Sequence, residues 1–136
     1  MPSFSKRSRD NLETADVRLQ KLFNEVIKEF DCTIISGHRS PEEQFELFKK
    51  GRQEIDGVWK KVGATVTNLD GIVKRSKHND FPSKAVDVVP YPIDWNNTKA
   101  FEEMGRVVKR KALDMGIDIQ WGGDWPMKDR PHFQVA

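Results

Sequence analysis

A carboxylate interrupts one of the most apolar segments of the sequence, Ala85 to Val89, which has the sequence AVDVV. The β-branched residues predict a strand that ends at Pro90 and places Asp87 between apolar neighbours. An ionised carboxylate in such a strand is costly unless a cation or hydrogen-bond donors compensate its charge. We therefore expect Asp87 to bind a metal ion or, alternatively, an arginine or backbone N–H groups.

Two of the three histidines each have a carboxylate at a sequence spacing that a metal site could use. His78 lies in the loop before the strand, and His132 begins another predicted strand. Catalytic zinc takes three protein ligands and leaves a fourth position open. Cys32 is the single cysteine, which excludes an internal disulfide and a multi-cysteine zinc site. We predict a Zn²⁺ site at His78, Asp87 and His132; taken singly, the histidines also fit a solvated loop residue and a strand-start residue.

The size and charge of the chain indicate a small single-domain protein and disfavour nucleic-acid binding. We predict a single domain over residues 1–136, with residues 1–11 forming a loosely ordered N-terminal segment. The 23 basic and 21 acidic residues are too evenly balanced to favour a nucleic-acid-binding module. No apolar run approaches the roughly 18–20 residues of a membrane span, and the basic N-terminus lacks the apolar stretch of a secretory signal. We expect a monomer made in a cytoplasm, without stable membrane insertion.

Hydrophobic periodicity predicts three helices, at about 14–30, 41–50 and 98–115. Thr14 is the expected N-cap of the first, and Ser40 and Glu43 form a capping box at the start of the second. Short β-branched runs predict strands at 32–36, 64–68, 85–89, 117–121 and 132–135. This order predicts an α+β domain with a small, mostly antiparallel sheet packed with three helices. The long connection at 51–75 is expected to form a cleft wall.

Four segments together resemble a known family. They have the sequences SGHRSPEEQFELFKKG (36–51), SKHNDFPSKAVD (76–87), WGGDW (121–125) and DRPHFQ (129–134). In this combination the chain resembles peptidase family M15, the zinc D-Ala-D-Ala carboxypeptidases and L-alanyl-D-glutamate endopeptidases, and especially its phage endolysin-like members. The resemblance implies a hedgehog/DD-peptidase-like fold.

The resemblance also implies roles for individual residues. The zinc ligands of the family fall on His78, Asp87 and His132. Its catalytic acid/base falls on Asp129, and its substrate- and oxyanion-contacting arginine falls on Arg39. One departure is the spacing from His78 to Asp87, which is nine positions where the family pattern H-x-x-G-x-A-x-D has seven.

Four further polar residues have less definite roles. We expect His38 and Ser76 to contact substrate, although His38 also fits a polar residue at a strand-to-helix corner. Asp124 is a candidate for orienting a zinc-bound imidazole. Asp80 lies in the apparent two-residue insertion between His78 and Asp87, and is an alternative metal ligand.

The function implied by the resemblance is zinc-dependent hydrolysis of the peptide stem of bacterial peptidoglycan. The expected form is a phage endolysin with L-alanyl-D-glutamate endopeptidase activity, made in the host bacterial cytoplasm and acting on the cell wall after release. The alternatives are a D-alanyl-D-alanine carboxypeptidase and a non-catalytic, metal-stabilised cell-wall-binding module.

Overall fold

The centre of the computed structural model is an antiparallel four-stranded sheet with the order β1–β4–β6–β5. The model describes residues 2–67, 69–71 and 75–136. The strands are β1 (Cys32–Ser36), β4 (Ala85–Pro90), β5 (Ile119–Trp121) and β6 (His132–Val135). The register pairs Asp87 of β4 directly with His132 of β6. The predicted α+β class and antiparallel sheet are therefore confirmed.

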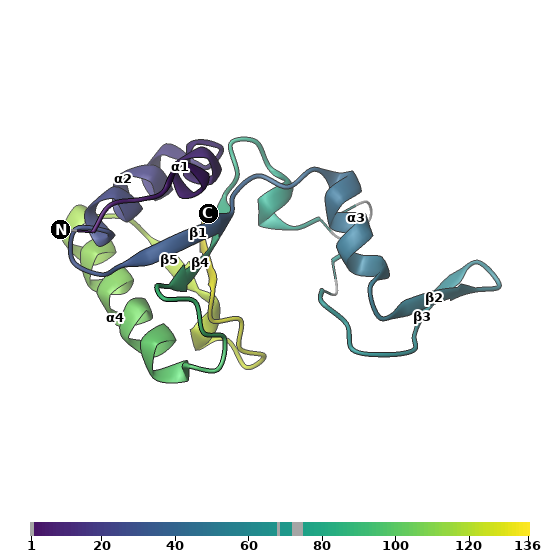
Figure 1. Cartoon of the computed structure of the whole chain (residues 1–136). Coiled ribbons are helices and arrows are strands. Elements are labelled where there is room, and N and C mark those ends of the chain that lie inside the picture. The colour runs from purple at the N-terminus through teal and green to yellow at the C-terminus, as the bar shows by residue number, and fades with distance from the viewer. Residues whose placement is uncertain (1, 68, 72–74) are drawn as a thin grey trace.

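Helices α2 (Val17–Val26) and α4 (Thr98–Met115) pack against one face of this sheet (Figure 1). Their apolar stripes meet the sheet residues that alternate away from Asp87. The core contains Leu19, Leu22, Phe23 and Val26 of α2, Met104 and Val108 of α4, and Val86, Val88 and Phe133 of the sheet. None of the helices in the described part of the chain has the length and apolarity to cross a membrane. The opposite face of the sheet carries Asp87 and His132 beside the buried apolar residues Ala85 and Val89.

The N-terminal segment, expected to be loosely ordered, instead contains helix α1 (Lys6–Glu13), so the described residues form four α-helices rather than three. This helix lies along β1, the edge strand of the sheet. The Ser8 hydroxyl accepts a hydrogen bond from the backbone N–H of Ile34 at 3.1 Å, and the Asn11 amide donates to the carbonyl of Ile34 at 2.9 Å. Polar side chains of α1 thus satisfy an edge that would otherwise lack partners.

The helix predicted at 14–30 is correspondingly shorter. Thr14 is the C-cap of α1 rather than an N-cap, and the N-cap of α2 is Asp16, whose carboxylate accepts from the N–H of Arg18 at 2.8 Å. The prediction was wrong because the apolar stripe alone does not mark where one helix ends and the next begins.

Helix α3 (Pro41–Lys49) and the hairpin β2 (Arg52–Ile55) and β3 (Val58–Lys61) project away from the sheet (Figure 1). The capping box of Ser40 and Glu43 is confirmed. The strand predicted at 64–68 is wrong for residues 64–67, which form none, and residue 68 lies outside the described residues. The hairpin turns at Asp56 and Gly57, which both have positive φ angles (52° and 77°), as a type I′ turn requires.

Candidate metal centre

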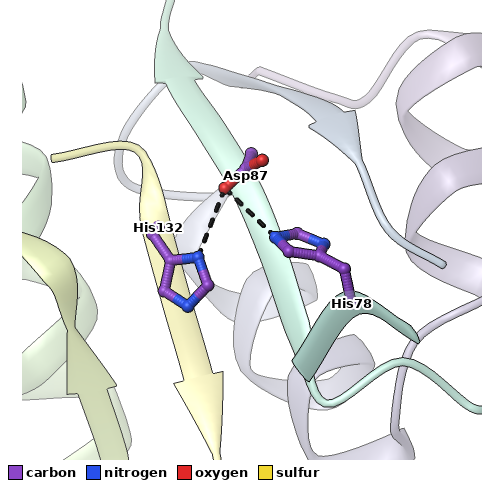
Figure 2. A group of neighbouring side chains, drawn as sticks. All are labelled: His78, Asp87 and His132. Atoms are coloured by element: carbon purple, nitrogen blue, oxygen red, sulfur yellow. Dashed lines mark ion pairs between the residues drawn. The ribbon is translucent and has the colours of Figure 1, made fainter. Parts of the chain in front are cut away.

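Three side chains converge on the face of the sheet that faces away from the helices (Figure 2). His78 comes from the short 3₁₀ helix η1 (Lys77–Asn79), Asp87 from β4 and His132 from β6. Asp87 Oδ1 lies 3.4 Å from His78 Nε2 and 3.6 Å from His132 Nδ1. One ligand atom from each residue lies within 4.8 Å of the other two. The sequence prediction that these residues meet is confirmed.

The three residues fit a metal ion. Two ligands bound to zinc at about 2.0–2.1 Å in a tetrahedral arrangement lie about 3.3–3.4 Å apart, close to the two distances found here. His78 Nε2 is buried and has no hydrogen-bond partner among the described residues, although it points toward Asp87. A buried polar atom without a partner is costly, and a cation at the centre of the group would satisfy it. Two imidazoles and a carboxylate suit Zn²⁺.

Each imidazole is fixed through its other ring nitrogen. His78 Nδ1 lies 2.8 Å from the carbonyl of Gly37, and His132 Nε2 lies 2.8 Å from Oε1 of Gln134. Both oxygens can only accept, so these nitrogens carry the protons and the facing nitrogens keep lone pairs for a metal. The amide of Gln134 is oriented in turn by its donation to Gln120 Oε1 at 3.0 Å.

Asp124 does not orient either imidazole. It forms an ion pair with Lys109 at 3.1 Å, and its side chain is 55% exposed. The residues that take this role are Gly37 and Gln134. For Gln134 the sequence held a signal, since alternation along the strand places it on the same face as His132.

The two oxygens of Asp87 have separate partners. Oδ1 faces the imidazoles, and Oδ2 accepts from Nη2 of Arg39 at 3.3 Å. Burial works to raise the pKa of Asp87, but its electrostatic interactions with the neighbouring imidazoles of His132 and His78 hold it well below its ordinary value. Burial works to lower the pKa of His132, but the negative charge of Asp87 raises it. The sequence offered an arginine as an alternative to a metal ion at Asp87. Arg39 does bind Asp87, but through the oxygen that faces away from the two imidazoles.

The segment carrying His78 is bound to the corner between β1 and α3. The N–H of Arg39 donates to the carbonyl of His78 at 2.7 Å, and the Asn79 side chain donates to the carbonyl of Arg39 at 2.8 Å. A side chain at Gly37 would collide with Thr14 at the end of α1, so this corner requires glycine.

The apparent insertion between His78 and Asp87 is held by the connection between α1 and α2. The N–H of Ser83 donates to the carbonyl of Thr14 at 2.8 Å, and the N–H of Asp16 donates to the carbonyl of Ser83 at 2.7 Å. The extra residues therefore do not separate the ligands. Asp80, the alternative ligand, is not part of the candidate metal group.

Asp129 lies beside the ligand group, with Oδ2 at 3.8 Å from His132 Nδ1 and a side chain that is 50% exposed. Burial raises the pKa of this carboxyl against the opposing charge of His132. The N–H of Asp129 donates to the carbonyl of Gly122 at 2.9 Å. A side chain on Gly122 would collide with the Asp129 backbone, which explains a glycine at this position of WGGDW.

A cleft of about 320 Å³ opens over this group. One wall carries the metal ligands, Arg39 and Asp129, and the opposite wall carries Leu47, Val66, Thr67 and Leu69. The expectation that residues 51–75 contribute a cleft wall is confirmed for Val66, Thr67 and Leu69, whereas Leu47 belongs to α3. Trp125 lines the cleft next to the His132 ring, at 5.1 Å between centroids.

Of the two residues expected to contact substrate, Ser76 lines the cleft and His38 does not. Ser76 lines the cleft, but its hydroxyl accepts from the N–H of His78 at 3.1 Å and caps η1. The His38 ring lies against Phe81, with Nδ1 3.0 Å from the carbonyl of Asp80, and it is not among the residues that line the cleft. Their contact with substrate stays a prediction.

Comparisons with known proteins agree with this geometry. The family model of the phage L-alanyl-D-glutamate peptidases matches residues 2–134. The L-alanyl-D-glutamate peptidase of Escherichia phage T5 is 25% identical over 97% of this chain and 88% of its own length. The crystal structure of the L-Ala D-Glu endopeptidase ChiX of Serratia marcescens superimposes with a TM-score of 0.74, covering 99% of this chain and 91% of that one at 25% identity. Since the family match spans almost the whole sequence, the chain belongs to the family of phage L-alanyl-D-glutamate peptidases.

Proposed function

We propose that this protein is a zinc-dependent endopeptidase of bacterial peptidoglycan that cleaves the bond between L-alanine and D-glutamate in the peptide stem. The observation that carries the proposal is the meeting of His78, Asp87 and His132 on one wall of an open cleft. The T5 and Serratia marcescens relatives are named for this bond, which supports the same substrate here.

The chemistry divides between the ion and the chain. Zn²⁺ held by the three ligands would supply a Lewis acid that polarises the scissile carbonyl and lowers the pKa of water. Asp129, at the edge of the ligand group, accepts the proton of the attacking water and returns it to the leaving amine. Its partly exposed carboxylate is free to face both reactants because the backbone, not the side chain, is bound to Gly122.

Arg39 stabilises the oxyanion that develops on the scissile carbonyl. Nη1 of its guanidinium donates to Gln44 Oε1 at 2.7 Å and Nη2 donates to Asp87 Oδ2 at 3.3 Å, so the group is held in place before substrate arrives. A fixed cation in a partly dry cleft stabilises developing negative charge more than a mobile one does, because no reorganisation is needed during the reaction.

The cellular setting follows from the family. We expect a phage endolysin made in the host cytoplasm and acting on the wall after release. It would work as a monomer, since all three ligands, Asp129 and Arg39 come from one chain. The relatives' names give no support to the D-alanyl-D-alanine carboxypeptidase alternative.

The bond is tested by digesting purified peptidoglycan and identifying the products by mass spectrometry. A new amino terminus on D-glutamate is the expected product. Release of free D-alanine would instead identify a carboxypeptidase. Treatment with a chelator should abolish digestion, and added Zn²⁺ should restore it, with one zinc per chain by metal analysis.

The role of Asp129 separates a catalyst from a wall-binding module. Asp129→Ala should lose at least about 100-fold in rate, the usual contribution of a general base, while still binding zinc. Asp124→Ala is the matched control, because Asp124 is an exposed carboxylate of the same loop that pairs with Lys109 instead. Equal activity of the two variants would remove Asp129 from the mechanism.

A further inference from the structure

Two of the three residues directly before the metal ligand His78 are cationic. Arg75 and Lys77 lie on either side of Ser76, and all three line the cleft. Arg75 Nη2 donates to the carbonyl of Asn79 at 3.1 Å, which fixes its guanidinium near η1. Lys77 is exposed, and its ammonium forms no ion pair with the residues that the structure describes.

The acidic residues of the cleft do not neutralise this pair. Among the described lining residues, the carboxylates are Asp87 and Asp129. Asp87 is already surrounded by Arg39 and the two imidazoles, and the nearest charged partner of Asp129 is His132 at 3.8 Å. Arg75 and Lys77 therefore add positive charge at the mouth of a cleft in which a divalent cation is expected. Such a field attracts an anionic ligand.

A glutamyl residue within a peptide chain provides that anion. Its amine and one carboxyl group are used in the chain, and its second carboxyl group remains free and ionised close to the bond that joins it to alanine. Amidation of this group removes its charge but hardly changes its size. A cleft with cationic side chains beside the catalytic centre can therefore distinguish the acid from the amide.

We propose that Lys77, assisted by Arg75, binds the free carboxylate of the glutamyl residue and makes the enzyme selective for stems that are not amidated there. This inference rests on the proposed cleavage at the alanyl–glutamate bond. Lys77 supplies the mobile charge, and Arg75 is the more firmly held member of the pair. Because Lys77 is exposed, the expected effect is that of a solvent-accessible ion pair, about fivefold in substrate affinity, and it should weaken as salt is added.

The test uses two synthetic stem peptides that differ only in a free carboxylate or a carboxamide on the glutamyl residue. Steady-state kinetics with the zinc-loaded full chain should show a lower KM for the acid and similar kcat for both. Lys77→Gln should raise KM for the acid about fivefold and leave the amide unchanged. Lys77→Glu should make the amide the better substrate, and Arg75→Gln should weaken the preference for the acid.

The matched control is Lys60→Gln, which makes the same change in net charge on the exposed hairpin strand β3, outside the cleft. It should keep the wild-type preference. Equal cleavage of both peptides by the wild type and by Lys77→Gln would overturn this inference and leave the proposed function standing. Failure of the wild-type zinc protein to cleave either peptide would overturn both.

Discussion

The cleft lies between two regions that are stabilised in different ways. The body consists of the sheet with α1, α2 and α4, and it contains every residue of the hydrophobic core. The arm, residues 40–71, contains α3, the hairpin and the following loop. Among its described residues only Gln44 and Gly71 are buried. The candidate metal ligands thus lie on densely packed strands or are bound to them, whereas the opposite wall belongs to a region with almost no core.

The arm is held together by surface contacts and by one buried amide. Phe45 packs edge-to-face on Trp59, and the guanidinium of Arg52 lies 4.0 Å from the centroid of Phe48. Gln44 accepts from Arg39 at 2.7 Å and donates to the carbonyl of Leu69 at 2.7 Å. Core packing therefore sets the position of the candidate metal ligands, whereas a few polar contacts that open more easily set the position of the facing wall.

The largest effect on stability is expected for Phe133→Ala in the body. Phe133 is fully buried between Phe23 and Trp121, with ring centroids at 5.5 and 6.3 Å, and it follows the ligand His132 on β6. Loss of the ring should lower the free energy of unfolding by about 3–5 kcal/mol. Chemical denaturation would measure it. A loss below about 1 kcal/mol would contradict the division between body and arm.

The second largest effect on stability is expected at Gln44, which connects the arm to the body. Gln44→Ala removes partners from Arg39 and from the Leu69 carbonyl, and should cost about 1–3 kcal/mol. Activity should fall while the zinc content is unchanged, because the ligands remain on the body. Gln53→Ala, an exposed glutamine of β2, is the control and should behave as wild type. Loss of zinc from Gln44→Ala would show that the arm also positions the ligands.

A smaller effect is expected where α1 covers the edge of the sheet. Ser8→Ala leaves the N–H of Ile34 without the hydroxyl that now accepts from it, at a cost of about 1 kcal/mol. Thermal unfolding of this variant can be compared with Ser3→Ala, where the side chain is exposed. Equal stability of the two variants would mean that water replaces Ser8 at this edge.

The smallest effect on global stability is expected for Trp59→Ala in the hairpin. Trp59 is only partly buried and packs on Phe45, outside the core. Its loss should cost less than about 1 kcal/mol in global unfolding, but hydrogen exchange of the hairpin amides should become faster. If this variant loses as much stability as Phe133→Ala, the arm does not unfold separately.

The sequence predicted the body better than the arm, and the reason is physical. The strands and α4 follow apolar periodicity, and the same alternation assigned a face of its own strand to Asp87 and to His132. Helix α1 escaped prediction because Ser8 and Asn11 stabilise it through hydrogen bonds to a distant strand. Such contacts leave no periodic pattern in the sequence.

The hairpin was missed for a different reason. The dipeptide Asp56-Gly57 is a strong indicator of a type I′ turn, but the flanking strands are short and mostly polar, whereas the β-branched residues at 64–68 predicted a strand that does not form at 64–67. The candidate site was predictable because two of its members are histidines, of which the chain has three, and the third is a carboxylate within an apolar strand. Of the partners that orient them, Gln134 had a signal in its position on the same strand face as His132, but the Gly37 carbonyl had none, because every residue has a backbone carbonyl.

The pairing of Asp87 with His132 links folding of the sheet to binding of a metal ion. The two residues face each other across neighbouring strands, so a slip of one residue between β4 and β6 would turn one of them to the helix side of the sheet. A misaligned chain would then lose both its ability to capture the ion and its complementary apolar layer. Binding of the ion by a folded chain would therefore show that β4 and β6 have paired in their native register.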